Sequence, residues 1–156
     1  MIRSLPITTT DKIRKVENLM LIQADNYHLD LKSALHHLLS SGGKRVRPTL
    51  TILIGDMLGA DPERLITLAA AIELLHTGTL VHDDLIDGSL LRRGIATLNA
   101  QWNPGATVLT GDFILARAAR LASDTDSIPV MSVFSTTLGI IVNGEINQMF
   151  AGRCVT

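Results

Sequence analysis

Apolar residues recur at three- and four-residue spacings along most of the chain, which is typical of amphipathic helices rather than strands. They are mostly Leu, Ile and Ala, and aromatic residues make up only 3% of the sequence. Near the N-terminus, for example, Ile13, Val16 and Met20 fall on one side of a predicted helix. The pattern predicts an all-α protein of about six helices.

Capping residues predict where these helices begin. Thr9 or Thr10 can cap the first helix and Asp30 the second, because a short polar side chain accepts a hydrogen bond from a free backbone N–H. Asp61 followed by Pro62 is a strong start signal for a long helix. The expected helices cover residues 9–27, 30–42, 48–59, 62–87, 106–123 and 126–150, with a loop at 88–105 that can hold one turn of helix.

Composition is that of one folded domain with a hydrophobic core, since 46% of the 156 residues are apolar and 19% are charged. The formal net charge of -1 gives no general electrostatic reason to bind nucleic acid or an anionic membrane. The charge is unevenly spread, however. Residues 1–50 carry eight Lys or Arg and four Asp or Glu, whereas residues 51–156 carry six and eleven. This asymmetry favours a site where anions and cations meet.

Cysteine content and hydropathy predict the compartment. Cys154 is the single cysteine, which excludes an internal disulfide and favours a reducing cytoplasm. The first residues do not resemble a secretory signal. The richest apolar run, residues 65–75, is interrupted by Glu73 and is shorter than the roughly 20 residues needed to cross a bilayer, so we expect no membrane span.

The segment from Glu73 to Asp87 contains the most informative acidic pattern. On a helix, Asp83 and Asp87 are one turn apart on one face, and His76 and Glu73 extend that face toward the N-terminus. Like charges at this spacing repel, so the arrangement favours a bound cation. Mg²⁺ suits such a site because it binds one or two carboxylates together with water and substrate phosphates. The alternative is an acidic, solvated helix end.

Two basic clusters flank this segment. Arg92 and Arg93 follow the acids, and the sequence GGKRVRP at 42–48 places Lys44 and Arg47 beside glycines that let a backbone approach a ligand closely. Each cluster taken alone could be a solvated basic loop. The spacing is not that of a nucleotide phosphate loop, and no strand precedes it.

Taken together, GGKRVRP at 42–48, ELLHxxxLxHDDLID at 73–87 and RRG at 92–94 resemble the trans-prenyltransferases, the polyprenyl diphosphate synthase family that includes farnesyl and geranylgeranyl diphosphate synthases. The resemblance continues through TGD at 110–112 and GEINQ at 144–148. It implies the N-terminal half of the isoprenoid synthase helical fold, as a single polyprenyl synthetase domain over residues 1–156. It also implies Mg²⁺-dependent head-to-tail condensation of isopentenyl diphosphate with an allylic prenyl diphosphate.

The resemblance assigns roles to individual residues. It implies that Asp83, Asp84 and Asp87 form the first aspartate-rich motif, which holds Mg²⁺, and that Arg92 grips the allylic diphosphate; these four are the expected catalytic residues. The residues expected to bind substrate are Lys44, Arg47, His76 and Arg93 at isopentenyl diphosphate, Arg92 at the allylic diphosphate, and Gln148 near the prenyl chain.

One departure from the family leaves the activity open. The second aspartate-rich motif normally follows the GExxQ segment, but the sequence ends at Thr156. The chain could be a truncated synthase, a half-length protein that forms a homodimer or joins a partner chain, or a non-catalytic diphosphate-binding subunit. A purely structural helical module is a weaker alternative, since it needs no such acids and arginines. A terpene cyclase is the other enzyme class to consider, although GGKRVRP and RRG argue against it.

Two expectations concern apolar surfaces. The resemblance implies that a growing prenyl chain extends along a tunnel beside the helix of the first aspartate-rich motif. Gly78 and Thr79, five and four residues before Asp83, are small, so we expect this tunnel to be open and a complete enzyme to make a medium- to long-chain product. Apolar residues spread around the predicted helix at 126–150 should leave exposed surface, and we therefore expect a dimer or an aggregation-prone protein.

Overall fold

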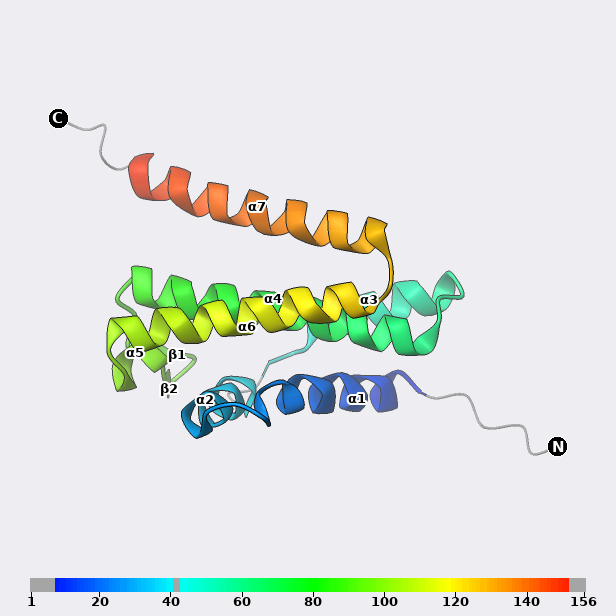
Figure 1. Ribbon diagram of the computed structural model, residues 1–156, viewed down its shortest axis with the longest axis horizontal. Coiled ribbons are helices and arrows are strands. Elements are labelled where there is room, and N and C mark those ends of the chain that lie inside the picture. The colour runs from blue at the N-terminus through cyan, green and yellow to red at the C-terminus, as the bar shows by residue number, and fades with distance from the viewer. Residues whose placement is uncertain (1–7, 41–42, 152–156) are drawn as a thin grey trace.

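The computed structural model describes residues 8–40 and 43–151, and it confirms the all-helical prediction (Figure 1). Gly42 of the first basic motif and Cys154 lie outside the described residues. Within these ranges the chain forms seven α-helices, one short 3₁₀ helix and one small hairpin. In chain order they are α1 (Thr9–Leu21), η1 (Ile22–Ala24), α2 (Leu29–Ser40), α3 (Val46–Met57), α4 (Pro62–Ile86), β1 (Leu91–Arg92), β2 (Ile95–Ala96), α5 (Leu98–Gln101), α6 (Pro104–Asp124) and α7 (Ile128–Ala151).

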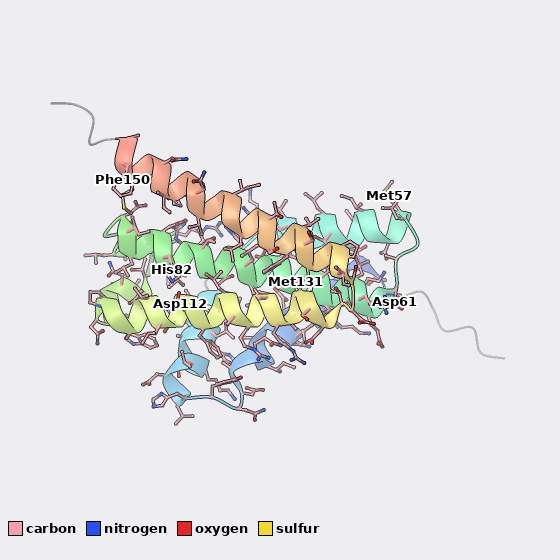
Figure 2. The ribbon with its side chains drawn as sticks, turned by 45° about the horizontal axis from the view of Figure 1, so that its top comes forward. Met57, Asp61, His82, Asp112, Met131 and Phe150 are labelled. Atoms are coloured by element: carbon pink, nitrogen blue, oxygen red, sulfur yellow. The ribbon has the colours of Figure 1, made fainter. Side chains whose placement is uncertain are left out.

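Helix α4 is the centre of the fold and packs most extensively against α6, which runs beside it (Figures 1 and 2). Three consecutive alanines of α4, Ala69 to Ala71, are fully buried, and their small side chains let neighbouring helices approach closely. Helices α1 and α2 lie on one side of the α4–α6 pair and α7 on the other (Figure 1). The core is therefore concentrated around α4, the helix that carries the acidic motif.

The start of α4 follows the sequence prediction. Asp61 is its N-cap, and the Asp61 carboxylate accepts a hydrogen bond from the Arg64 N–H at 2.9 Å. Pro62 occupies the first helical turn, where its missing N–H costs nothing. A well-defined start fixes which way each later side chain of this long helix points.

Two other cap predictions are wrong. Thr8, rather than Thr9 or Thr10, caps α1 by accepting a hydrogen bond from the Asp11 N–H at 3.2 Å. Helix α2 begins at Leu29, so Asp30 lies inside its first turn instead of capping it. A carboxylate within the first turn still stabilises the helix, because it interacts favourably with the positive end of the helix dipole.

The segment after α4 contains a β-hairpin that the periodicity did not predict. Strands β1 and β2 pair antiparallel, with Leu91 opposite Ala96 and Arg92 opposite Ile95. The two turn residues, Arg93 and Gly94, have φ of 52° and 80°, as a two-residue turn of the left-handed type requires. The hairpin turns Arg92 back toward α4. Helix α5 is the turn of helix expected within the loop.

Helix α7 exposes apolar side chains, as the sequence predicted. Among its described residues only Phe134 is buried, whereas Ile128 and Ile140 are 87% and 68% exposed.

By length and composition alone, α4 and α7 are both able to span a membrane, a criterion that core helices of soluble proteins also meet. The interruption by Glu73 therefore does not by itself exclude a span. More than half of the apolar stretch of α4 is buried inside the protein, but only 6% of that of α7 is.

Candidate functional site

A cavity of about 520 Å³ opens between the start of α3, one face of α4 and the hairpin. We call it the basic cavity, because four arginines and a lysine line it. Its lining residues are Leu38, Gly43, Lys44, Arg45, Val46, Arg47, Glu73, His76, Thr77, Leu80, Asp84, Arg92 and Arg93. All the residues expected to bind isopentenyl diphosphate, namely Lys44, Arg47, His76 and Arg93, are therefore brought together here.

The spacing argument predicted that Asp83 and Asp87 share one face of α4 with His76 and Glu73, and the structure differs. Asp84, not Asp83, lines the basic cavity with His76, and Asp83 lines a second cavity on another side of α4. Asp84 follows Glu73 and Thr77 at spacings of eleven and seven residues, so it falls on their face of the helix. His76 lies at the edge of that face. The predicted common face is therefore wrong for Asp83, which lines a different cavity from His76 and Glu73.

Asp84 and Arg92 form a tight ion pair at the edge of the basic cavity. Arg92 Nη2 lies 2.7 Å from Asp84 Oδ1, and Arg92 Nε donates to both carboxylate oxygens at 2.9 and 3.0 Å. Asp84 is only 6% exposed. The hydrogen bond that Arg92 donates to Asp84 raises the pKa of the guanidinium above its ordinary value. Arg92 is thus held in a fixed orientation by a buried carboxylate.

His76 is electrically neutral in this setting. Burial, reinforced by the positive charges of Arg47, Arg92 and Arg93, lowers the pKa of His76 to about 4. A neutral imidazole has one ring N–H to donate and one ring nitrogen that accepts. At neutral pH His76 can therefore donate a hydrogen bond to an anion without adding charge.

Arg45 contributes to the site in a way that sequence reasoning missed. Its side chain is 16% exposed, and its guanidinium nitrogens Nε and Nη1 lie 3.0 Å from Glu17 Oε1 and 3.4 Å from Glu73 Oε1. It also donates to the Leu39 carbonyl at 2.7 Å. Within the run KRVR nothing in the sequence separates an arginine that contacts other helices from one that faces a ligand.

A second cavity of about 300 Å³ lies between α4, α6 and α7, and we call it the apolar groove. It is lined by Thr79, His82, Asp83, Leu85, Ile86, Val108, Leu115, Leu138, Ile141, Val142, Glu145, Ile146 and Met149. Most of the lining is apolar, and it contains two carboxylates, those of Asp83 and Glu145. Burial raises the pKa of Asp83, and the negative charges of Glu145 and Asp87 raise it further. Gln148, expected near the prenyl chain, is exposed on α7 and is not a lining residue, whereas Glu145 of the same motif is.

His82 of α4 joins the groove to α6. Its Nε2 lies 3.2 Å from the Val108 carbonyl and 3.4 Å from Asp112 Oδ1 (Figure 2). A Cβ added at Gly111 would come within 2.3 Å of His82 Nε2, so the ring occupies the space that a side chain would need. This contact explains the glycine in the TGD segment and fixes α6 beside the turn of α4 that carries Asp83.

The donor set around Asp83 fits a hard cation that also binds phosphate. Among the described residues, no group of three or more His, Cys, Asp or Glu side chains is arranged to hold a metal ion alone. Asp83 and Asp87 offer oxygen ligands, and a cation would relieve their mutual repulsion. Asp84 differs because both of its oxygens already bind Arg92. Mg²⁺ at Asp83, Asp84 and Asp87 remains a prediction.

Comparison with known proteins agrees with the fold and the motifs. The polyprenyl synthetase family model matches residues 28–155. Octaprenyl diphosphate synthase of Escherichia coli is 41% identical over 114 residues, which are 73% of this chain and 35% of that protein. The all-trans-nonaprenyl-diphosphate synthase of Rhodobacter capsulatus is 45% identical over 120 residues, covering 76% of this chain and 37% of the relative.

Among solved structures, the polyprenyl synthase of Caulobacter crescentus, complexed with calcium and isoprenyl diphosphate, superposes with a TM-score of 0.86 at 35% identity. The match covers 90% of this chain and 43% of that one. The architecture is therefore that of the helical isoprenoid synthases, and it corresponds to their N-terminal half. The chain belongs to the polyprenyl synthetase family. It spans less than half the length of the relatives described here.

Proposed function

We propose that the chain supplies the diphosphate-binding half of a polyprenyl diphosphate synthase, which condenses isopentenyl diphosphate head-to-tail with an allylic prenyl diphosphate. The observation that carries this proposal is the basic cavity itself. It gathers Lys44, Arg47 and Arg93 around a neutral His76, next to the Asp84–Arg92 pair. Such a set matches an anion with many oxygen acceptors, since lysine and arginine form charge-assisted hydrogen bonds to phosphate.

In this proposal the residues of the basic cavity divide between two diphosphates. Lys44, Arg47, His76 and Arg93 hold isopentenyl diphosphate. Arg92 faces the allylic diphosphate and stabilises the negative charge that develops as the allylic carbon–oxygen bond breaks. The isopentenyl double bond then attacks the allylic carbon, and a proton is lost. Asp84 orients the Arg92 guanidinium, so that little reorganisation is needed during the reaction.

Mg²⁺ is the metal that we propose for this chemistry, and Asp83 and Asp87 would hold it. When bound, the ion supplies positive charge that helps the diphosphate leave. Asp83 lies at the apolar groove, which is mostly lined by apolar side chains and suits the hydrocarbon part of the allylic substrate. We propose a medium- to long-chain product, in line with the names of the octaprenyl and nonaprenyl diphosphate synthases.

We also propose that activity needs a second chain or further sequence, and that the protein works in the cytoplasm. One relative is named heptaprenyl diphosphate synthase component 2 and is 34% identical over 140 residues, which are 44% of its length. Its name favours a partner subunit as one possible arrangement. A non-catalytic diphosphate-binding subunit is therefore the second candidate function.

The decisive experiment measures binding and turnover separately. Titration calorimetry of the purified chain with inorganic diphosphate, with and without Mg²⁺, should show binding that Mg²⁺ strengthens. Labelled isopentenyl diphosphate and an allylic diphosphate should give little or no product with the chain alone. If the wild-type chain does not bind diphosphate, the proposal is wrong. Binding without turnover, even after the candidate partner subunit is added, would favour the non-catalytic subunit.

A further inference from the structure

Arg45 connects the basic cavity to three other helices. Its three guanidinium nitrogens reach α1 through Glu17, the end of α2 through the Leu39 carbonyl, and α4 through Glu73. Its own backbone has a φ of 46°, in the left-handed region that residues other than glycine seldom adopt. Such a conformation persists only where surrounding contacts hold it.

Arg45 lies in the turn that leads into α3. Arg45 is the residue that precedes α3, directly after Lys44 and two residues before Arg47. The contacts of Arg45 therefore hold in place the backbone turn that presents both of these side chains to the cavity. The Cβ position of Gly43 lies 3.3 Å from Arg45 Nη1 and 3.7 Å from Arg93 Nη1, so the turn also approaches the hairpin.

Glu73 has an unusual position for a carboxylate in a cavity that favours anions. Its side chain is 9% exposed and lines the basic cavity. One oxygen, Oε1, faces Arg45, while the other, Oε2, is buried without a hydrogen-bond partner in the described part of the chain. A buried, unsatisfied carboxylate oxygen is costly, so its presence calls for a function.

We propose that Arg45 is the positioning residue of the anion-binding turn and that Glu73 neutralises the charge of Arg45. Affinity for diphosphate then comes from the other basic residues of the cavity, and the charge of Glu73 weakens it. This inference rests on the proposed function. Residues of one basic run then have two roles. Lys44 and Arg47 contact the ligand, whereas Arg45 holds the backbone turn that positions them.

The test is a double-mutant cycle read by calorimetry with inorganic diphosphate. Arg45→Met should weaken binding by about tenfold or more, because the turn loosens and the charge of Glu73 is left unbalanced beside the anion. Glu73→Gln should tighten binding by about three- to tenfold, since it removes a negative charge near the anion. In the double variant, Glu73→Gln should recover part of the affinity lost through Arg45→Met.

Two comparison variants make the result specific. Lys12→Met breaks another ion pair between helices, Lys12 with Asp56, outside the basic cavity, and should lower stability without changing diphosphate affinity. Arg47→Met should weaken diphosphate binding because a direct contact is lost. Adding Glu73→Gln to Arg47→Met should not restore that contact. If circular dichroism shows that Arg45→Met does not fold, the diphosphate affinity of Glu73→Gln alone tests the proposal.

The outcomes separate a failure of the proposed function from a failure of the proposed roles of Arg45 and Glu73. Failure of the wild-type chain to bind diphosphate would overturn the proposed function and this inference with it. Wild-type binding together with unchanged or weaker binding by Glu73→Gln would overturn the inference alone. Such a result would mean that the Arg45–Glu73 pair only stabilises the fold.

Discussion

Asp84 and Arg92 form a two-pronged ion pair in which Arg92 Nε lies 2.9 and 3.0 Å from the two carboxylate oxygens of Asp84. This pair separates Asp84 from Asp83 and Asp87, although all three belong to one motif. Asp84 faces the basic cavity, whereas Asp83 lines the apolar groove. One acid of the motif therefore orients an arginine, and the other two remain available to a cation.

This division predicts different effects of two alanine variants. Asp83→Ala with Asp87→Ala should abolish the strengthening of diphosphate binding by Mg²⁺, because the oxygen ligands are removed. Asp84→Ala should instead lower the free energy of unfolding by about 1–2 kcal/mol, since it leaves a half-buried arginine unpaired. Calorimetry and urea denaturation measure the two effects. The division would be wrong if the double variant kept its full response to Mg²⁺.

A second prediction concerns the contact between His82 and Gly111. Gly111→Ala should destabilise the protein by about 1–3 kcal/mol, because the new methyl group would displace the His82 ring and break its hydrogen bond to Val108. Gly139→Ala is the matched control: Gly139 is also helical, but nothing lies within 4 Å of its Cβ position. It should stabilise the protein by about 0.5–1 kcal/mol. Equal effects of the two variants would contradict the packing of His82.

Local signals in the sequence predicted the helices, but not the hairpin or the packing between helices. Helix positions could be predicted because a 3.6-residue period and a cap such as Asp61 are local signals. The hairpin could not, since each strand has only two residues and its turn depends on a left-handed Arg93. A general helical pattern also gave no warning that His82 fills the space beside Gly111.

For the site, the motifs predicted one shared cavity for the basic residues but not the positions of the acids. Lys44, Arg47, His76 and Arg93 do share one cavity, as the family resemblance implied. The sequence could not show that Asp83 and Asp84 serve different cavities, because that depends on which helices cover each side of α4. It also could not distinguish Arg45 from its basic neighbours, since the contacts of Arg45 come from three other helices.

The lowered pKa of His76 predicts a loss of stability in mild acid. The unfolded chain protonates His76 near pH 6.5, whereas the folded protein does so only near pH 4. Between these values the unfolded state binds the extra proton, so stability falls as pH falls from 6.5 toward 4. Because the side chain is partly exposed, we expect a loss of about 1–2 kcal/mol. Urea denaturation of wild type and His76→Gln across this range measures it: the variant should lose less stability, and parallel curves would contradict the assignment.

The structure corrects one of the two positions expected to control product length. A Cβ at Gly78 would lie 2.8 Å from Leu115 Cδ2, so Gly78 faces α6 rather than open space. Thr79 does line the apolar groove. In an active form of the enzyme, Thr79→Phe should shorten the product, because a ring excludes the prenyl chain. Gly78→Phe should instead disrupt the packing of α4 on α6 and lower stability.

Chromatography of the dephosphorylated alcohols and thermal denaturation separate these two effects. Thr79→Phe should keep a melting temperature close to that of wild type, since Thr79 is only partly buried. Gly78→Phe should melt several degrees lower, whatever it does to the product. Unchanged product length in Thr79→Phe would show that the growing chain does not enter this groove.

The last prediction concerns association of the chain through α7. Val133 and Ile140 are 67% and 68% exposed, and Val142 and Ile146 are 46% exposed. So much apolar surface on one helix normally marks an interaction site or an aggregation hazard. We expect light scattering at micromolar concentration to show dimers or larger species, and a dye that binds apolar surfaces to fluoresce.

Ile140→Glu should shift the protein toward monomers by placing a charge within this surface. Thr137→Glu, at another exposed position of α7, controls for added charge and should change association less. A wild-type chain that stays monomeric and binds no dye would show that α7 does not drive association.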